Sequence, residues 1–269
     1  MGRWGWAETG YRPRGCSERM EVVWFAVMKV SEEKAVELAA GLLRVQVAYA
    51  KSFGAGKFSD VFVVGAGGEE YVLRIAPPDS LIQLFYERRM MRQEPAIHGR
   101  LLKETGVPVP PIIAHDFGRE QIDRDYLLMA RFPGEPLSDA GLSLSARQRA
   151  MEEWGGYVRE IHGIKAEGNL FGYLGEHNCM EPQETWGEAF LIMYRRLLDD
   201  IVGCGIYEED TADWAMNLLR DKASVFDTCK ESRLCHGDLW VTNLLVRGSG
   251  EVTGVLDFDR ACWGDIEWD

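Results

Sequence analysis

Short apolar segments with alternating polar positions dominate the first half of the chain. Five of them have the composition and length of β-strands: 45–49, 60–64, 71–75, 112–117 and 125–129. The sequence GAGGEE at 65–70 is typical of a hairpin turn, so the first three strands are expected to form an antiparallel meander. Together the segments predict a five-stranded antiparallel sheet.

Two stretches near these strands follow helical spacing. A helix is expected to begin at Ser31, a hydroxyl N-cap followed by two glutamates, and to present an apolar face as far as Leu43. The second stretch, 81–105, contains Pro95. Proline either kinks a helix or lies in its first turn, so the second helix is kinked or begins near Glu94.

The second half of the chain is expected to be mainly helical. Apolar stripes at helical spacing run through 150–161, 186–201 and 214–219. The pattern then returns to short strands at 244–246 and 252–256, which a Gly-Ser-Gly-Glu turn separates. These last strands predict a β-hairpin near the end of the chain.

A linker rich in proline and glycine, RFPGEPL at 131–137, divides the two patterns. We therefore expect an N-terminal lobe at 31–131 and a C-terminal lobe at 132–269. Residues 1–30 form an extension of unclear role. Their longest apolar run, VVWFAVM, is short and precedes no small-residue cleavage site, so no signal peptide is expected.

Composition narrows the range of functions. The net charge of −13 argues against nonspecific nucleic-acid binding, which needs a basic surface. Acidity of this kind suits steering of a cationic small molecule and equally suits solubility. No apolar run reaches the roughly 18 residues of a membrane span. The six cysteines lack zinc-site spacing and are expected to be reduced thiols in the cytoplasm.

The strongest chemical pattern lies in the sequences HGDLWVTNLLV at 236–246 and GVLDFDRACWGD at 254–265. Phosphoryl transfer needs a carboxylate to accept the proton of an acceptor hydroxyl and oxygen ligands to hold Mg²⁺. Asp238 and Asn243 share one loop, and the predicted hairpin returns Asp257 beside that loop. Asp259 is either a second metal ligand or an ion-pair partner.

Here the chain resembles the aminoglycoside phosphotransferase and choline kinase family, whose members share a two-lobed protein kinase-like fold. His236, Asp238 and Asn243 match the family's H-G-D-x-x-x-x-N loop, and 256–259 resembles its I-D-[FW]-[DE] strand. The resemblance implies that Asp238 is the catalytic base, that His236 orients its loop, and that Asn243 and Asp257 bind magnesium. It also implies an α+β fold with a catalytic β-hairpin in the C-lobe.

The N-lobe contains candidate nucleotide-binding residues. Gly54, Gly56 and Ser59 lie in the sequence FGAGKFSD, where glycines let a strand-connecting loop approach phosphates closely. The loop is not a Walker A motif, because Lys57 is followed by Phe58. By the resemblance, the loop covers the nucleotide.

A cation for the α- and β-phosphates is expected on the third strand. Arg74 stands there, where many relatives have lysine. Its expected partner is Glu94, or Glu87 if the proline distorts the helix. The segment from Met129 to Arg131 resembles the family's lobe connector, which implies that its backbone meets the adenine edge.

The sequence therefore predicts an ATP- and Mg²⁺-dependent kinase that is a monomer or homodimer. The expected acceptor is a small molecule such as an aminoglycoside, an amino sugar, a choline-like alcohol or a fructosamine. A protein kinase is disfavoured because ten residues follow Asp259, too few for an activation segment and peptide-docking helices. Relatives continue with further helices where this chain ends, so a truncated or non-catalytic nucleotide-binding module is the alternative.

Overall fold

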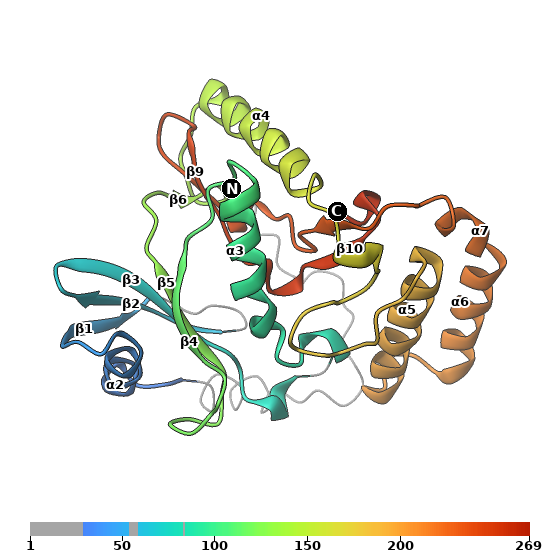
Figure 1. The fold of residues 1–269 in the computed structure, drawn as a ribbon, viewed down its shortest axis with the longest axis horizontal. Helices are drawn as coiled ribbons and strands as arrows, with labels where there is room; N and C mark the ends of the chain where they lie inside the picture. The colour runs from blue at the N-terminus through green and yellow to red at the C-terminus, as the bar shows by residue number, and fades with distance from the viewer. Residues whose placement is uncertain (1–28, 54–58, 83) are drawn as a thin grey trace.

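A five-stranded antiparallel sheet forms the N-terminal part of the molecule (Figure 1), as predicted. The computed structural model describes residues 29–53, 59–82 and 84–269. The strand order is β1-β2-β3-β5-β4. The strands are β1 (Val47–Ser52), β2 (Asp60–Ala66), β3 (Glu69–Ile75), β4 (Ile112–Asp116) and β5 (Tyr126–Ala130).

Helix α2 (Glu32–Leu43) packs against this sheet. It begins where the sequence predicts, because the Ser31 hydroxyl accepts a hydrogen bond from the Lys34 N–H at 3.2 Å. Its apolar face, which includes Leu38, meets inward residues of the strands such as Leu73 and Leu128. All three of these leucines are fully buried, and they form the core of the N-terminal part.

The segment between β3 and the next helix is not the continuous helix that the spacing suggested. Three short 3-10 turns, Asp79–Leu81, Phe85–Glu87 and Met90–Gln93, precede α3 (Glu94–Glu104). Pro95 lies in the first turn of α3, where the missing proline N–H removes no helical hydrogen bond. The alternative of a helix beginning near Glu94 is therefore confirmed, and helix over 81–93 is wrong.

The C-terminal part is mainly helical, with two small sheets. Its helices are α4 (Leu144–Ile161), α5 (Trp186–Gly203), α6 (Glu209–Asp221) and α7 (Ala223–Phe226). The strands β6 (Glu135–Pro136), β8 (Leu244–Val246) and β9 (Val252–Val255) form one sheet, and β7 (Arg233–Cys235) pairs with β10 (Cys262–Gly264). The predicted hairpin is β8–β9, and its two strands pair antiparallel.

One apolar core joins α3 to the C-terminal part. Ile97 and Leu101 of α3 belong to the same buried cluster as Ile161, Leu244 and Phe258. Figure 1 shows α3 standing between the sheet and the C-terminal helices. Packing on both sides thus fixes α3, and with it Glu94 at its first turn.

Two further observations concern the described residues. None of their helices is both long and apolar enough for a membrane crossing. Their cysteines, at 179, 204, 229, 235 and 262, all carry free thiols. The predicted glycines of the nucleotide-covering loop, Gly54 and Gly56, and most of the 1–30 extension lie outside the described residues.

Neighbouring leucines of α3 offer a matched test of this core. Leu101 is fully buried, whereas Leu102 is 47% exposed. We expect Leu101→Ala to lower the free energy of unfolding by about 2–5 kcal/mol, because it leaves a cavity in the shared core. Leu102→Ala should change it by less than about 0.5 kcal/mol. Urea denaturation of both variants measures the difference, and equal losses would contradict the packing described here.

Candidate active site

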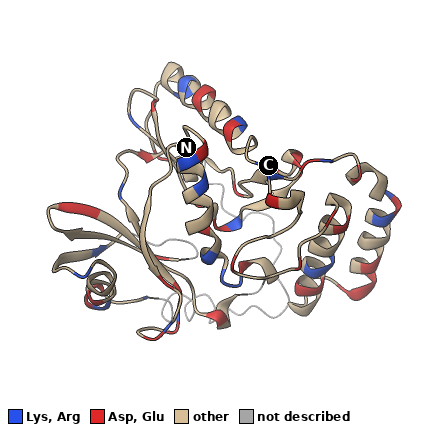
Figure 2. Ribbon diagram, in the orientation of Figure 1, with Lys and Arg blue, Asp and Glu red and all other residues tan. Residues whose placement is uncertain are grey.

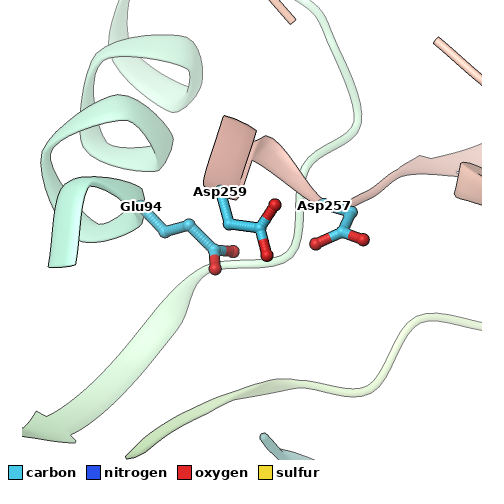
Figure 3. Close-up of side chains that lie close together, drawn as sticks. All are labelled: Glu94, Asp257 and Asp259. Atoms are coloured by element: carbon cyan, nitrogen blue, oxygen red, sulfur yellow. The ribbon is translucent and has the colours of Figure 1, made fainter. Parts of the chain in front are cut away.

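Arg74, in β3, is the centre of a buried ion-pair network. Its Nη1 donates to both carboxylate oxygens of Glu94, at 2.9 and 2.7 Å. Its Nη2 donates to Asp257 at 2.8 Å and to Asp259 at 3.2 Å. Figure 3 shows the three carboxyl groups close together, Glu94 from α3 and the two aspartates from the turn after β9. A single guanidinium therefore connects the sheet, α3 and the end of the hairpin.

The structure decides between the two candidate partners of Arg74. Glu94, which is fully buried, pairs with it as predicted. Glu87 instead accepts a hydrogen bond from Arg260 at 3.1 Å. The choice follows from the helix start, since α3 begins at Glu94 while Glu87 lies in a 3-10 turn that faces the C-terminal part.

Burial and neighbouring charges shift the pKa values of the four groups in this network. Burial alone would lower the pKa of Arg74, but Glu94, Asp257 and Asp259 together raise it, so the guanidinium stays protonated. Burial raises the pKa of Glu94 to about 7 and raises that of Asp259, while Arg74 opposes both shifts. Burial also acts on Asp257, but Arg74 holds its pKa below the usual value. Asp257 is thus the most acidic carboxyl group of the three, and its side chain is 34% exposed.

The residues fit a magnesium ion at Asp257 and Asn243. The Asn243 Nδ2 donates to the backbone oxygen and to Oδ2 of Asp238, at 3.0 and 3.1 Å, which leaves its Oδ1 as a possible ligand. Asp257 adopts a left-handed conformation, with φ 69° and ψ 60°, and lines a cavity together with Asn243. An amide oxygen and a carboxylate are the donors that Mg²⁺ prefers.

Asp259 has the ion-pair role that the sequence left open. Oxygens of Glu94, Asp257 and Asp259 lie within 4.8 Å of one another, a spacing suited to a metal. The Arg74 guanidinium bonds to all three carboxylates and already supplies a cation there. The Asp259 side chain is only 7% exposed, and a metal-ligand role for it stays a prediction.

His236 holds the backbone of the loop that carries Asp238. Its Nε2 lies 2.9 Å from the Leu256 oxygen, and its Nδ1 accepts from the Asp238 N–H at 3.2 Å. These partners require the neutral tautomer with the proton on Nε2. Burial lowers the pKa of His236, which favours the same neutral form. The geometry suits the predicted orienting role.

Asp269 fixes the other end of the same loop. Its two carboxylate oxygens accept the backbone N–H groups of His236 and Gly237, each at 2.7 Å, and one also lies 3.0 Å from Nε2 of His162. Gly237 has φ +77°, and a Cβ there would stand 2.3 Å from the Arg260 oxygen. No local pattern in the sequence indicates this role for Asp269, because the contact joins it to residues 32 and 33 positions earlier.

A cavity of about 810 Å³ lies between the sheet and the C-terminal part. Five of the predicted residues line it: Arg74, Met129, Arg131, Asn243 and Asp257. Ser59 is buried at the start of β2 and borders a separate, very small cavity. The large cavity therefore connects the lobe connector with the proposed magnesium ligands.

A free backbone donor in this cavity lies one residue beyond the predicted connector segment. The Ala130 N–H donates to Pro111 at 3.0 Å and the Arg131 N–H to Glu70 at 3.3 Å, so both are already used. Within the described residues, the N–H of Phe132 has no hydrogen-bond partner, and Phe132 lines the cavity. Strand propensity could not show this, because it does not reveal where pairing stops.

His98 also lines this cavity, and the sequence reasoning missed it. It lies one helical turn after Glu94, on the same face of α3, and that spacing was the available signal. Its Nδ1 lies 2.8 Å from the Pro110 oxygen, which ties α3 to the strand that follows.

Comparison with known proteins agrees with this geometry. Residues 50–269 match the profile of the phosphotransferase enzyme family. A Vibrio parahaemolyticus protein named probable ketoamine kinase is 23% identical over 247 residues, which cover 85% of this chain and 73% of that protein. Human acyl-CoA dehydrogenase family member 11 is 24% identical over 217 residues, 78% of this chain but only 26% of its own length.

Solved structures share the fold. A thermostable mutant of aminoglycoside phosphotransferase APH(4)-Ia, in complex with AMP-PNP and hygromycin B, has a TM-score of 0.62 at 18% identity. The match covers 87% of this chain and 73% of that one. A Haemophilus somnus protein provisionally named a fructosamine-3-kinase has a TM-score of 0.62 at 16% identity, covering 91% and 76% of the two chains. The predicted α+β, kinase-like fold is thus confirmed.

Buried His98 should make stability depend on pH. Burial lowers its pKa to about 4 from the usual 6.5, so the unfolded state binds a proton that the folded state refuses between these values. The stabilisation is complete above pH 6.5 and is lost as the pH falls toward 4. We expect His98→Gln to reduce the slope of unfolding free energy against pH by about 1.4 kcal/mol per pH unit in this window. Denaturant titrations from pH 4.5 to 7 measure it; parallel curves would refute it.

Proposed function

This chain belongs to the phosphotransferase enzyme family, and on that basis we propose that it transfers the γ-phosphate of ATP to a hydroxyl group of a small molecule. One observation carries the proposal: Asn243 and Asp257 line the end of a nucleotide-sized cavity, and Asn243 is hydrogen-bonded to Asp238. A base and two oxygen ligands at one site are what phosphoryl transfer requires.

The nucleotide would lie in the cavity of about 810 Å³. Its adenine edge would accept the N–H of Phe132, beside Met129, and its phosphates would reach Arg74. Asn243 and Asp257 would hold Mg²⁺, which when bound neutralises phosphate charge. The complexes of APH(4)-Ia with AMP-PNP or ADP, which share this fold, support the proposal that this chain binds a nucleotide.

In the proposed reaction Asp238 accepts the proton of the acceptor hydroxyl. The acceptor oxygen bonds to the γ-phosphorus as the bond to the oxygen bridging the β-phosphate breaks, and ADP leaves. The Asn243 amide fixes the Asp238 carboxylate, while His236 and Asp269 hold the loop backbone. Preorganisation of this kind provides most of the rate enhancement in phosphoryl transfer.

The names of the relatives favour a polyhydroxylated acceptor. They refer to ketoamines, fructosamines and aminoglycosides, and each class carries several hydroxyl groups. Presence of both aspartates and the asparagine opposes the alternative of a non-catalytic nucleotide-binding module.

Replacing the proposed base tests catalysis directly. Asp238→Ala should lower kcat for acceptor phosphorylation, or for slow ATP hydrolysis without acceptor, by about 10²–10⁴-fold, because the hydroxyl proton loses its acceptor. ATP binding should persist, since Asp238 does not line the nucleotide cavity. Asp123→Ala, at a 98% exposed side chain, is the matched control. Unchanged turnover in Asp238→Ala would support the non-catalytic alternative.

A second pair of variants tests the metal ligands. Asp257→Asn should abolish most of the gain in ATP affinity that Mg²⁺ provides, because an amide binds the ion more weakly than a carboxylate. Asp259→Asn should retain that gain if Asp259 serves only as the ion-pair partner of Arg74. Calorimetric titration of ATP with and without Mg²⁺ measures both. Loss of the gain only in Asp259→Asn would reverse the assignment.

A further inference from the structure

A second cavity, of about 710 Å³, opens between the β3–α3 connection and helix α5. Phe85 belongs both to this cavity and to a smaller one of about 150 Å³. The smaller cavity has aromatic walls, which include Tyr86 and Tyr173, and reaches Gly237, the neighbour of Asp238. The smaller cavity therefore lies beside the loop that carries the proposed base, and Phe85 borders both cavities.

Three arginines and three aspartates line the larger cavity. Arg88 and Arg89 are exposed in its wall, and neither guanidinium group forms a hydrogen bond or an ion pair within ranges 29–53, 59–82 and 84–269. Arg196 of α5 donates to the Cys179 oxygen and lies 5.8 Å from the ring centre of Phe85. Three guanidinium groups thus border one cavity, and two of them have donors to spare.

The acidic residues in the same wall are largely engaged elsewhere. Both oxygens of Asp79 accept from Arg119, at 2.8 and 3.0 Å; Arg89 also contributes to lowering its pKa. Asp199 pairs with Arg195 at 2.8 Å. Asp200 accepts the backbone N–H of Phe85 at 2.6 Å. The charged side chains of this wall that have no partner among the described residues are therefore those of Arg88 and Arg89.

His177 supplies an independent indication of a ligand. Its side chain is 7% exposed and lines the cavity, yet neither ring nitrogen has a hydrogen-bond partner among the described residues. Burial lowers its pKa to about 4, so the ring is neutral and retains one N–H donor. A buried polar group without a partner is costly. Both ring nitrogens are themselves buried, so an acceptor atom of a ligand would have to enter beside the ring to bond to one of them.

We propose that this cavity binds an anionic group, a carboxylate or a phosphate, on the acceptor that the kinase phosphorylates; the assignment rests on the proposed function. Arginine forks match the two oxygens of either group. The apolar or ring-shaped body of the acceptor would then occupy the aromatic cavity and bring its hydroxyl to Asp238.

The arginines of this cavity belong to a protein whose overall charge is negative. The protein carries a net charge of −13, and Figure 2 shows acidic segments on the β2–β3 hairpin and on α6. General electrostatics would steer cations to this protein, but the unpaired guanidinium groups of Arg88 and Arg89 repel them at short range. A polycationic aminoglycoside is therefore disfavoured, whereas a ketoamine formed on an amino acid carries the required carboxylate.

Binding of simple anions tests the site without knowledge of the acceptor. Benzoate and phenyl phosphate are titrated into the full chain by calorimetry, with benzamide as the neutral analogue. We expect one or both anions to bind and benzamide to bind at least tenfold more weakly. The double variant Arg88→Gln/Arg89→Gln should lower anion affinity at least tenfold. Arg147→Gln/Arg149→Gln, two exposed arginines of α4, makes the same charge change and should have no effect.

An acceptor screen separates this inference from the proposed function. Hydroxy acids and phosphorylated alcohols are compared with their amides or unphosphorylated parents, and with aminoglycosides, using ATP and Mg²⁺. Preference for the carboxylates or for the phosphates, weakened in Arg88→Gln/Arg89→Gln, identifies the anion. Phosphorylation of aminoglycosides alone would overturn the inference and leave the kinase proposal intact. If anions bind but no acceptor is phosphorylated in a way that depends on Asp238, the kinase proposal fails while the anion-binding site stands.

Discussion

The contact of Arg74 with three carboxylates is the constraint on which the rest of the site depends. Charges taken out of water are stable only when opposite charges and hydrogen bonds surround them. Arg74 comes from the sheet, Glu94 from α3, and Asp257 and Asp259 from the turn after β9. Because each of these charges would be energetically unfavourable if buried without its partners, the ion pairs fix the two parts of the molecule relative to each other. This fixed arrangement sets the shape of the cavity between the two parts.

The loop that carries Asp238 follows a different principle, in which side chains hold the backbone groups. A neutral His236 accepts a hydrogen bond from one backbone N–H, and an ionised Asp269 accepts hydrogen bonds from two. These bonds hold the loop in place without regular secondary structure. At Gly237 the loop backbone lies so close to the Arg260 oxygen that a side chain would not fit. Irregular backbone of this type is usual where a side chain must be presented to a ligand.

The sequence predicts those features that local physics determines. Strand alternation, the Ser31 cap and the spacing of Asp238 and Asn243 all act over a few residues, and the structure has the corresponding elements. The partner of Arg74 and the bond from Asp269 to the loop depend on contacts between distant segments, which no local pattern encodes. The 3-10 turns before α3 were missed because their apolar spacing imitates a helix. The arginine-lined cavity likewise exists only once β3, α3 and α5 are assembled.

Arginine, rather than lysine, at position 74 changes what nucleotide binding involves. One terminal nitrogen of the guanidinium donates to Glu94 and the other donates to the aspartates. The aspartates thus occupy the donors with which an arginine could bind phosphate oxygens. Under the proposed function, an arriving phosphate would compete with Asp257 for the second nitrogen, and the released carboxylate would then be free for a metal ion. Binding of nucleotide and binding of metal would consequently be coupled through one exchange of ion-pair partners at Arg74.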